Sequence, residues 1–171
     1  MTQKQLNELL KLAEVESPFT QMALDNLSNS EIIRRQLQVE FEKHIRSKEG
    51  VSGLVERIRK ITGATMNRAR TVAQTERTRS LNSKRMADAI RQYQAAYEKA
   101  VKNHRKRPEL PVFQWVNPLR AKEPRHEHVA ISGDKRPIGE EFLPGLRYPG
   151  DPNAPPEQTI NCHCYIRKAV K

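Results

Sequence analysis

The sequence predicts an α+β fold: N-terminal helices, one of them long, followed by a small loop-rich antiparallel β unit docked on the long helix. Apolar residues recur at helical spacing between residues 3 and 104, and neither proline nor glycine interrupts residues 65–104. Ten of the eleven prolines lie from Pro108 onward, where the helical spacing disappears. This second part has too few apolar residues to be stable alone, so we expect it to pack on the long helix, to be held by a metal ion, or both.

The length of 171 residues predicts one domain, or one domain with a helical extension. Hydrophobic residues make up 36% of the chain and charged residues 30%, so part of it should be solvated helix. No apolar run approaches the roughly 18 residues of a membrane span, and the polar start of the chain has no secretory signal. We therefore expect no membrane partner. Two cysteines without such a signal indicate a reducing compartment.

Three shorter helices precede the long one. The first spans residues 3–16, with Leu6, Leu9 and Leu10 on one face. The second follows a capping box from Ser28 to Glu31 and runs to about residue 46. Its apolar stripe comprises Ile32, Ile33, Leu37, Phe41 and Ile45. The third spans residues 51–61 and is ended by a glycine.

The long helix is predicted from about residue 65 to residue 104. Its core-facing stripe comprises Met66, Ala69, Val72 and Ala73, and then Met86, Ile90, Tyr93, Tyr97 and Val101. Between these runs polar residues occupy the same face, with Glu76 first among them. A buried carboxylate needs a partner, so we expect Glu76 to face the β unit and to pair with Arg125 or a histidine of residues 125–128. Pairing with Arg79 one turn on, or a helix that leaves the core here, are the alternatives.

In the second part of the chain, residues 112–116, 127–131 and 162–170 are the strand candidates. Turns are expected at residues 132–134 and 149–152.

The two cysteines form a Cys-x-Cys pair, Cys162 and Cys164, and a second pair, His126 and His128, lies upstream. Residues two apart on a strand point the same way, so each pair could aim both side chains at one point. Two thiolates with one or two imidazoles make a tetrahedral zinc set. A disulfide within Cys-x-Cys is the poorer explanation because extended backbone holds those Cα atoms too far apart. The alternative is that both cysteines are buried apolar residues.

The net charge of +11 is concentrated in residues 57–107, which hold fifteen Lys/Arg and three Asp/Glu. Such a field favours a polyanion, most simply nucleic acid, and few aromatic residues are present for stacking on bases. The alternative is a basic helix packed on an acidic protein. We expect Arg105, Lys106 and Arg107, after the end of the long helix, to make the nucleic-acid or protein contact.

Four sequence pieces occur in order over roughly residues 50–170. They are Ala73-Gln74-Thr75-Glu76 followed by Arg79 and Asn82; a strand around Trp115 followed by Arg125-x-x-His128 and Ile131-Ser132-Gly133; Tyr148-Pro149-Gly150-Asp151-Pro152; and Asn161-Cys162-His163-Cys164. Together they resemble the phage head-morphogenesis or minor capsid family, the Mu F-like proteins. The resemblance assigns residues 51–171 to that domain, helical over 51–107 and β over 108–171, and leaves residues 1–50 unassigned.

The resemblance implies a minor structural protein of a tailed-phage head. Such a protein is associated with the portal protein and other head proteins, lies in the capsid interior near the portal, and is in the host cytoplasm during assembly. It also implies contact with packaged or ejected DNA and no enzymatic activity. The resemblance further implies a structural role for four polar residues, Glu76, Arg79, Asn82 and Arg125.

The chain departs from the family pattern at two positions. His163 stands where the family usually has arginine, and Thr159 stands where some members have a histidine. The fourth metal ligand therefore stays open between His126, His163 and a water molecule. The alternative function is a small basic metal-dependent nuclease or toxin-like domain. It would use His104, His126, His128 and His163 as acids and bases.

Overall fold

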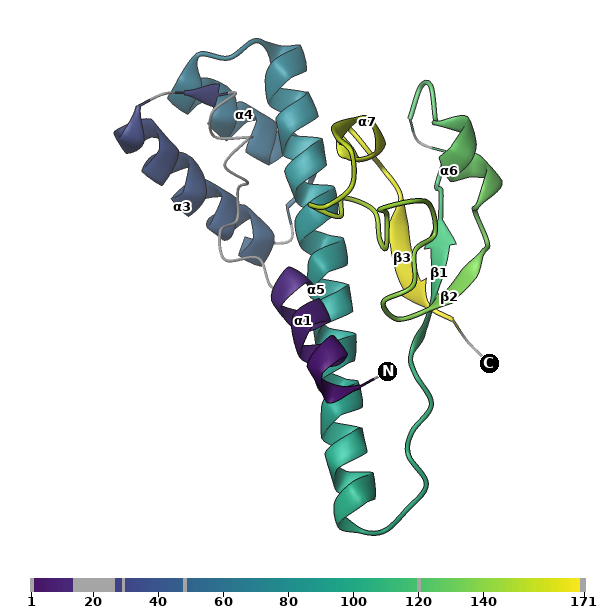
Figure 1. Ribbon diagram of the computed structural model, residues 1–171. Coiled ribbons are helices and arrows are strands. Elements are labelled where there is room, and N and C mark those ends of the chain that lie inside the picture. Colours follow the sequence, from purple (N-terminus) through teal and green to yellow (C-terminus); the bar gives the residue numbers. More distant parts are fainter. Residues whose placement is uncertain (1, 14–26, 29, 48, 120, 170–171) are drawn as a thin grey trace.

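The structure is a computed structural model that describes residues 2–13, 27–28, 30–47, 49–119 and 121–169. It confirms the predicted α+β class, with a long central helix and a small antiparallel sheet beside it (Figure 1). The N-terminal helices are α1 (Gln3–Ala13), α3 (Glu31–Ser47), α4 (Val51–Thr62) and α5 (Met66–Lys102). Residues 14–16, which the sequence assigned to the first helix, lie outside the described residues. None of the described helices is both long enough and apolar enough to cross a membrane.

Helices α3 and α4 pack against the first turns of α5 through apolar side chains. This core comprises Leu37, Phe41, Leu54, Val55, Ile58, Ala69 and Ala73. The predicted stripe of α3 is wrong at Ile32, which is 72% exposed at the first turn of the helix. The predicted capping box is also absent, because α3 begins only at Glu31 and the Ser28 hydroxyl accepts a hydrogen bond from the backbone N–H of Ser30 (3.0 Å).

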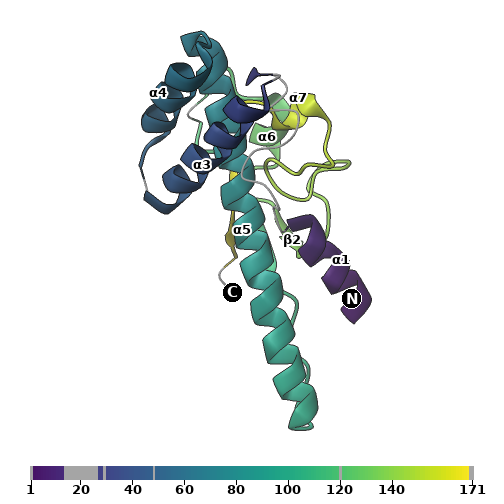
Figure 2. The same ribbon diagram turned by 90° about the vertical axis from the view of Figure 1, so that its left-hand side faces the viewer.

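The long helix α5 begins and ends within two residues of its predicted bounds. The Thr65 hydroxyl caps its start by accepting a hydrogen bond from the backbone N–H of Arg68 (3.4 Å). At the two ends of the predicted stripe, Met66 is 36% exposed and Val101 is 51% exposed. The C-terminal part of α5 extends past the other helices and the sheet in both views (Figure 2), so its last turns have few neighbours to bury an apolar side chain.

The sheet consists of β1 (Val112–Val116), β2 (Lys135–Pro137) and β3 (Tyr165–Lys168) in the antiparallel order β2–β1–β3. The first predicted strand is confirmed, and the third is shorter than predicted. The predicted strand at residues 127–131 is wrong: this segment is the short helix α6 (His126–Ala130). Its hydrogen bonds run from the Val129 N–H to the Arg125 carbonyl and from the Ile131 N–H to the Glu127 carbonyl.

A second apolar core joins the sheet to the later turns of α5 and to α1. Trp115 and Ile166, which face each other across β1 and β3, are fully buried in it. Met86, Ile90 and Tyr93 contribute from α5, and Leu6 contributes from α1. A four-residue helix that the sequence did not predict, α7 (Pro156–Thr159), leads from the long loop after β2 to the cysteine pair.

Candidate metal centre

The middle of α5 holds the cysteine loop through polar side chains. Gln74 and Thr78, one turn apart and both buried, donate hydrogen bonds to the backbone carbonyl of Cys162 at 3.2 and 2.6 Å. The Thr75 hydroxyl accepts a hydrogen bond from the backbone N–H of Asn161 (2.8 Å). The loop that carries the first cysteine is therefore fixed to the helix by its own backbone groups.

Asn82 fixes the segment that follows. Its amide nitrogen lies within hydrogen-bond distance of the carbonyls of Pro149 (3.2 Å) and Cys164 (3.3 Å), and its oxygen accepts from the N–H of Ile166 (3.0 Å). The side chain is 1% exposed. One asparagine thus joins α5, the loop at residues 148–152 and the start of β3.

Glu76 is 2% exposed, as the sequence predicted, but its predicted partner is wrong. Its carboxylate accepts hydrogen bonds from Nε and Nη2 of Arg79 at 2.9 and 2.7 Å, which is the alternative considered from the sequence. Arg125 instead donates to the backbone carbonyls of Glu157 and Ile160. Glu157 lies in α7 and Ile160 directly follows it, so Arg125, which precedes α6, joins α6 to α7 rather than to α5.

The loop at residues 148–152 packs directly on the backbone of α5. Gly150 has φ +81°, and a Cβ atom at this position would lie 2.7 Å from Cα and 2.9 Å from N of Arg79. Tyr148 is buried beside the helix, where its hydroxyl lies 3.4 Å from that of Ser83. Burial raises the pKa of Tyr148 to about 12. The close approach of the loop to Arg79 therefore requires glycine at position 150.

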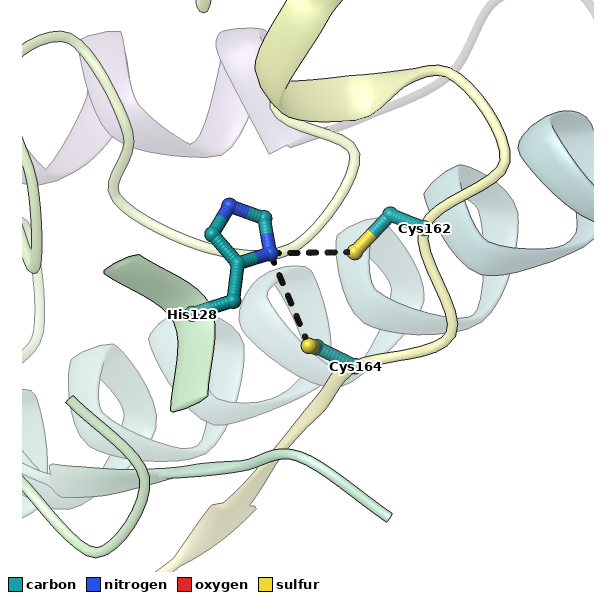
Figure 3. A group of neighbouring side chains, drawn as sticks. All are labelled: His128, Cys162 and Cys164. Atoms are coloured by element: carbon teal, nitrogen blue, oxygen red, sulfur yellow. Dashed lines mark hydrogen bonds between the residues drawn. The ribbon is translucent and has the colours of Figure 1, made fainter. Parts of the chain in front are cut away.

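Three predicted ligand residues converge in the space that these contacts create (Figure 3). Nδ1 of His128 lies 3.6 Å from Sγ of Cys162 and 3.6 Å from Sγ of Cys164. All three side chains are buried, their ligand atoms lie within 4.8 Å of one another, and both cysteines are free. This group could hold a metal ion.

Two residues that the sequence analysis missed orient the histidine. Nε2 of His128 lies 2.8 Å from Oε1 of Gln158, and the amide nitrogen of Gln158 donates to the Glu127 carboxylate (2.7 Å). The carboxylate only accepts, so it fixes which end of the Gln158 amide faces the ring. Nε2 then carries the proton and Nδ1 presents its lone pair to the two sulfur atoms, as a metal ligand must.

The two thiols differ in acidity. A hydrogen bond from the Cys164 thiol to the Cys162 sulfur lowers the pKa of Cys162, against the effect of burial. The same hydrogen bond and burial raise the pKa of Cys164. Cys162 is therefore the more acidic of the two thiols, and a bound cation would have to displace the proton from Cys164.

The other predicted ligands are not brought into the group. His126 is exposed, because residues two apart on a helix point to different sides, so the strand argument for the histidine pair is wrong even though His128 is in place. His163 is partly buried and lines a cavity of about 430 Å³ next to the cluster. His104, which the nuclease alternative would use, is exposed after the end of α5.

The predicted basic contact residues Arg105, Lys106 and Arg107 are exposed where the chain turns back from α5. The Arg107 guanidinium stacks over the ring of Tyr97, 5.3 Å from its centroid. Lys106 and Arg107 line a concavity of about 740 Å³ together with Lys135 of β2 and Lys168 of β3. These two lysines could not be identified from sequence spacing, because only the sheet brings them to the same place.

No family model, no curated protein and no solved structure matches this chain.

Proposed function

We propose that this chain is a minor structural protein of a tailed-phage head, bound at the portal vertex, and that His128, Cys162 and Cys164 hold a structural zinc ion. The observation that carries the proposal is spatial. The sequence pieces that resemble the Mu F-like family lie up to about ninety residues apart, and their residues contact one another around one cluster.

The resemblance therefore concerns residues that act together. Asn82 binds the carbonyls of Pro149 and Cys164, Arg79 underlies Gly150, and His128 contacts both cysteines. In most of these contacts a side chain binds backbone groups or fills space, as expected of a rigid joint between a helix and a loop-rich unit. A docking protein needs such a joint, because it keeps the helix and the loop-rich unit in a fixed arrangement.

Zinc suits this donor set best. Two thiolates and one imidazole are soft and borderline ligands, which select zinc over the hard cations calcium and magnesium. With Zn–S bonds of about 2.3 Å and Zn–N bonds of about 2.0 Å, ligand nitrogen and sulfur atoms of a tetrahedral site lie about 3.6 Å apart. The distances from His128 to the two sulfurs have this value.

In this proposal the partner is the portal protein, with other head proteins around it, and the chain lies inside the capsid after assembly in the host cytoplasm. The exposed end of α5 presents Arg105, Lys106 and Arg107, with Lys135 and Lys168 beside them, to packaged DNA. These cations would neutralise phosphates without reading sequence.

The zinc proposal is tested by the metal content and the affinity of the purified protein in chelator competition. We expect one zinc per chain in the wild type and loss of tight binding in Cys162→Ser. His126→Ala is the matched control because this exposed histidine lies on the same short helix as His128. A wild-type protein without affinity for zinc would refute the proposal.

The head-protein proposal is tested by co-expression with the portal protein of the same phage, followed by pull-down and by mass spectrometry of purified heads. We expect the chain in both. Its absence from both would contradict the proposal, and nicking of plasmid DNA in the presence of zinc or magnesium would favour the nuclease alternative.

Contact with DNA is tested by duplex binding as a function of salt. The logarithm of the binding constant should fall with the logarithm of salt concentration by about 0.9 per phosphate neutralised. Reversing Arg105, Lys106 and Arg107 to glutamate should reduce that slope. Reversing three exposed cations elsewhere, Lys4, Lys11 and Arg46, should leave it largely unchanged although the net charge is the same.

A further inference from the structure

We infer that the metal ion of this cluster keeps one coordination position that opens to solvent and binds a small anionic ligand. The inference rests on the proposed zinc site and goes beyond it, because structural zinc sites are normally closed by four protein ligands. Three observations carry it: the number of ligands, the position of the adjacent cavity and the charge of the cavity wall.

The described residues supply three ligands. The metal-ligating group consists of His128, Cys162 and Cys164, and neither His126 nor His163 belongs to it. His126 lies two residues before His128 on α6, and its side chain leaves the helix on another side and is exposed. His163 stands between the two cysteines and lines the adjacent cavity, outside the metal-ligating group.

The cavity of about 430 Å³ borders the cluster directly, since all three ligand residues line it. The cluster is enclosed by protein elsewhere: the ring of Trp115 stands edge-on to that of His128 at 5.1 Å, and Thr78 of α5 binds the carbonyl of Cys162. A tetrahedral ion bound to three ligands therefore has a route to solvent for its fourth position. The volume is within the range of small-molecule sites, roughly 300–1,000 Å³.

The wall of the cavity favours an anion. The cations Lys122 and Arg125 line it, and Glu123 is the one carboxylate among the described residues of its lining. Arg125 is held in place by two backbone carbonyls, so its charge stays at the cavity wall. A small anionic donor would bind the metal and be stabilised by these cations, and water would fill the position in its absence.

Cobalt(II) in place of zinc gives the test, because its visible absorption reports coordination number and ligand type. The full-length protein is loaded with cobalt and titrated with azide. We expect a tetrahedral spectrum that changes saturably with azide. Lys122→Ala should weaken azide binding about two- to five-fold, as expected for one exposed charge pair, and Lys60→Ala, an exposed lysine on α4, should not.

The possible outcomes separate this inference from the zinc proposal. Failure to take up cobalt or zinc overturns both. A tetrahedral cobalt spectrum that azide leaves unchanged overturns the open position and keeps the metal site. A spectrum altered by His163→Ala in the absence of azide identifies His163 as a fourth ligand, and one that depends on protein concentration identifies a ligand from a second copy; either result overturns the inference.

Discussion

The long helix α5 contacts its two sets of neighbours by different means. Toward α3 and α4 it presents small apolar residues, Ala69 and Ala73, to a core of leucine, valine, isoleucine and phenylalanine side chains. Toward the cysteine loop it presents Gln74, Thr78 and Asn82, which bind backbone carbonyls and one N–H group. Ala73 and Gln74 are adjacent in sequence, so the change of chemistry occurs between neighbouring residues.

The difference follows from what each neighbour needs. Helices satisfy their own backbone hydrogen bonds, so α3 and α4 require only apolar surface from α5. The loops around the cysteines have buried carbonyl and N–H groups that no regular secondary structure pairs. Side chains of α5 form hydrogen bonds with these groups. We therefore expect the helical contact to tolerate conservative substitution, and the polar contact to lose stability whenever a single partner is removed. Unfolding experiments can test this contrast. The single tryptophan, Trp115, reports on the C-terminal unit, and far-UV circular dichroism reports mainly on the helices.

The largest effect is expected for Glu76→Ala. Removal of one member of a buried ion pair leaves Arg79 charged and buried, at a cost of about 3–5 kcal/mol in the free energy of unfolding. Glu98→Ala, at an exposed position of the same helix, should change it by less than about 0.5 kcal/mol. Equal effects of the two substitutions would show that the pair contributes nothing beyond helix propensity.

Gly150→Ala should cost about 2–5 kcal/mol. The new Cβ would meet backbone atoms of Arg79 at under 3 Å, which adds overpacking of about 1–3 kcal/mol to the about 1–2 kcal/mol of a left-handed conformation. Gly63→Ala is the control, since Gly63 also has a positive φ (+69°) and nothing within 4 Å of its Cβ position. If Gly63→Ala costs as much as Gly150→Ala, the close approach of loop and helix is not a constraint.

Asn82→Ala should cost about 2–3 kcal/mol, because it leaves the buried carbonyl of Cys164 and the N–H of Ile166 unpaired. The transition followed by Trp115 fluorescence should shift more than the one followed by circular dichroism. Asn67→Ala, exposed near the start of α5, should be neutral or slightly stabilising since alanine is the better helix former. A coincident shift of both signals would mean that the two contacts unfold as one unit.

The smallest effect concerns pH and the helical contact. Burial, and then the charges of Arg77 and Arg57, lower the pKa of His44 in α3 below the ordinary value of 6.5. As pH falls below 6.5 the unfolded chain binds a proton that the folded protein does not, so stability decreases with acidification, by at most about 1.4 kcal/mol per pH unit. We expect this loss as pH falls below about 6.5 in the wild type and not in His44→Gln. The same slope in both proteins would exclude His44 as its source.

The helices could be predicted because the 3.6-residue spacing of apolar side chains is a local property of the sequence. The segment around His128 could not, because five residues fit either a strand or a helical turn. The helix that forms places Arg125 against the carbonyls of Glu157 and Ile160, more than thirty residues later. The cysteine pair and the histidine pair were both proposed from their spacing, and the resemblance singled out His128. Gln158 and Glu127 escaped notice since no sequence spacing links a glutamine to a histidine thirty residues away.

The polar face of α5 also matters while the chain is being made. Ile166, which binds Asn82, follows it by 84 residues, so at roughly 5–20 residues per second the ribosome supplies this partner about 4–17 seconds after the helix residue. During that delay an apolar face would be exposed to other nascent chains and would invite aggregation. Glutamine, threonine and asparagine can instead bind water until the loops arrive. The hydrogen-bonding face thus adds little to the risk of aggregation before its partner is synthesised.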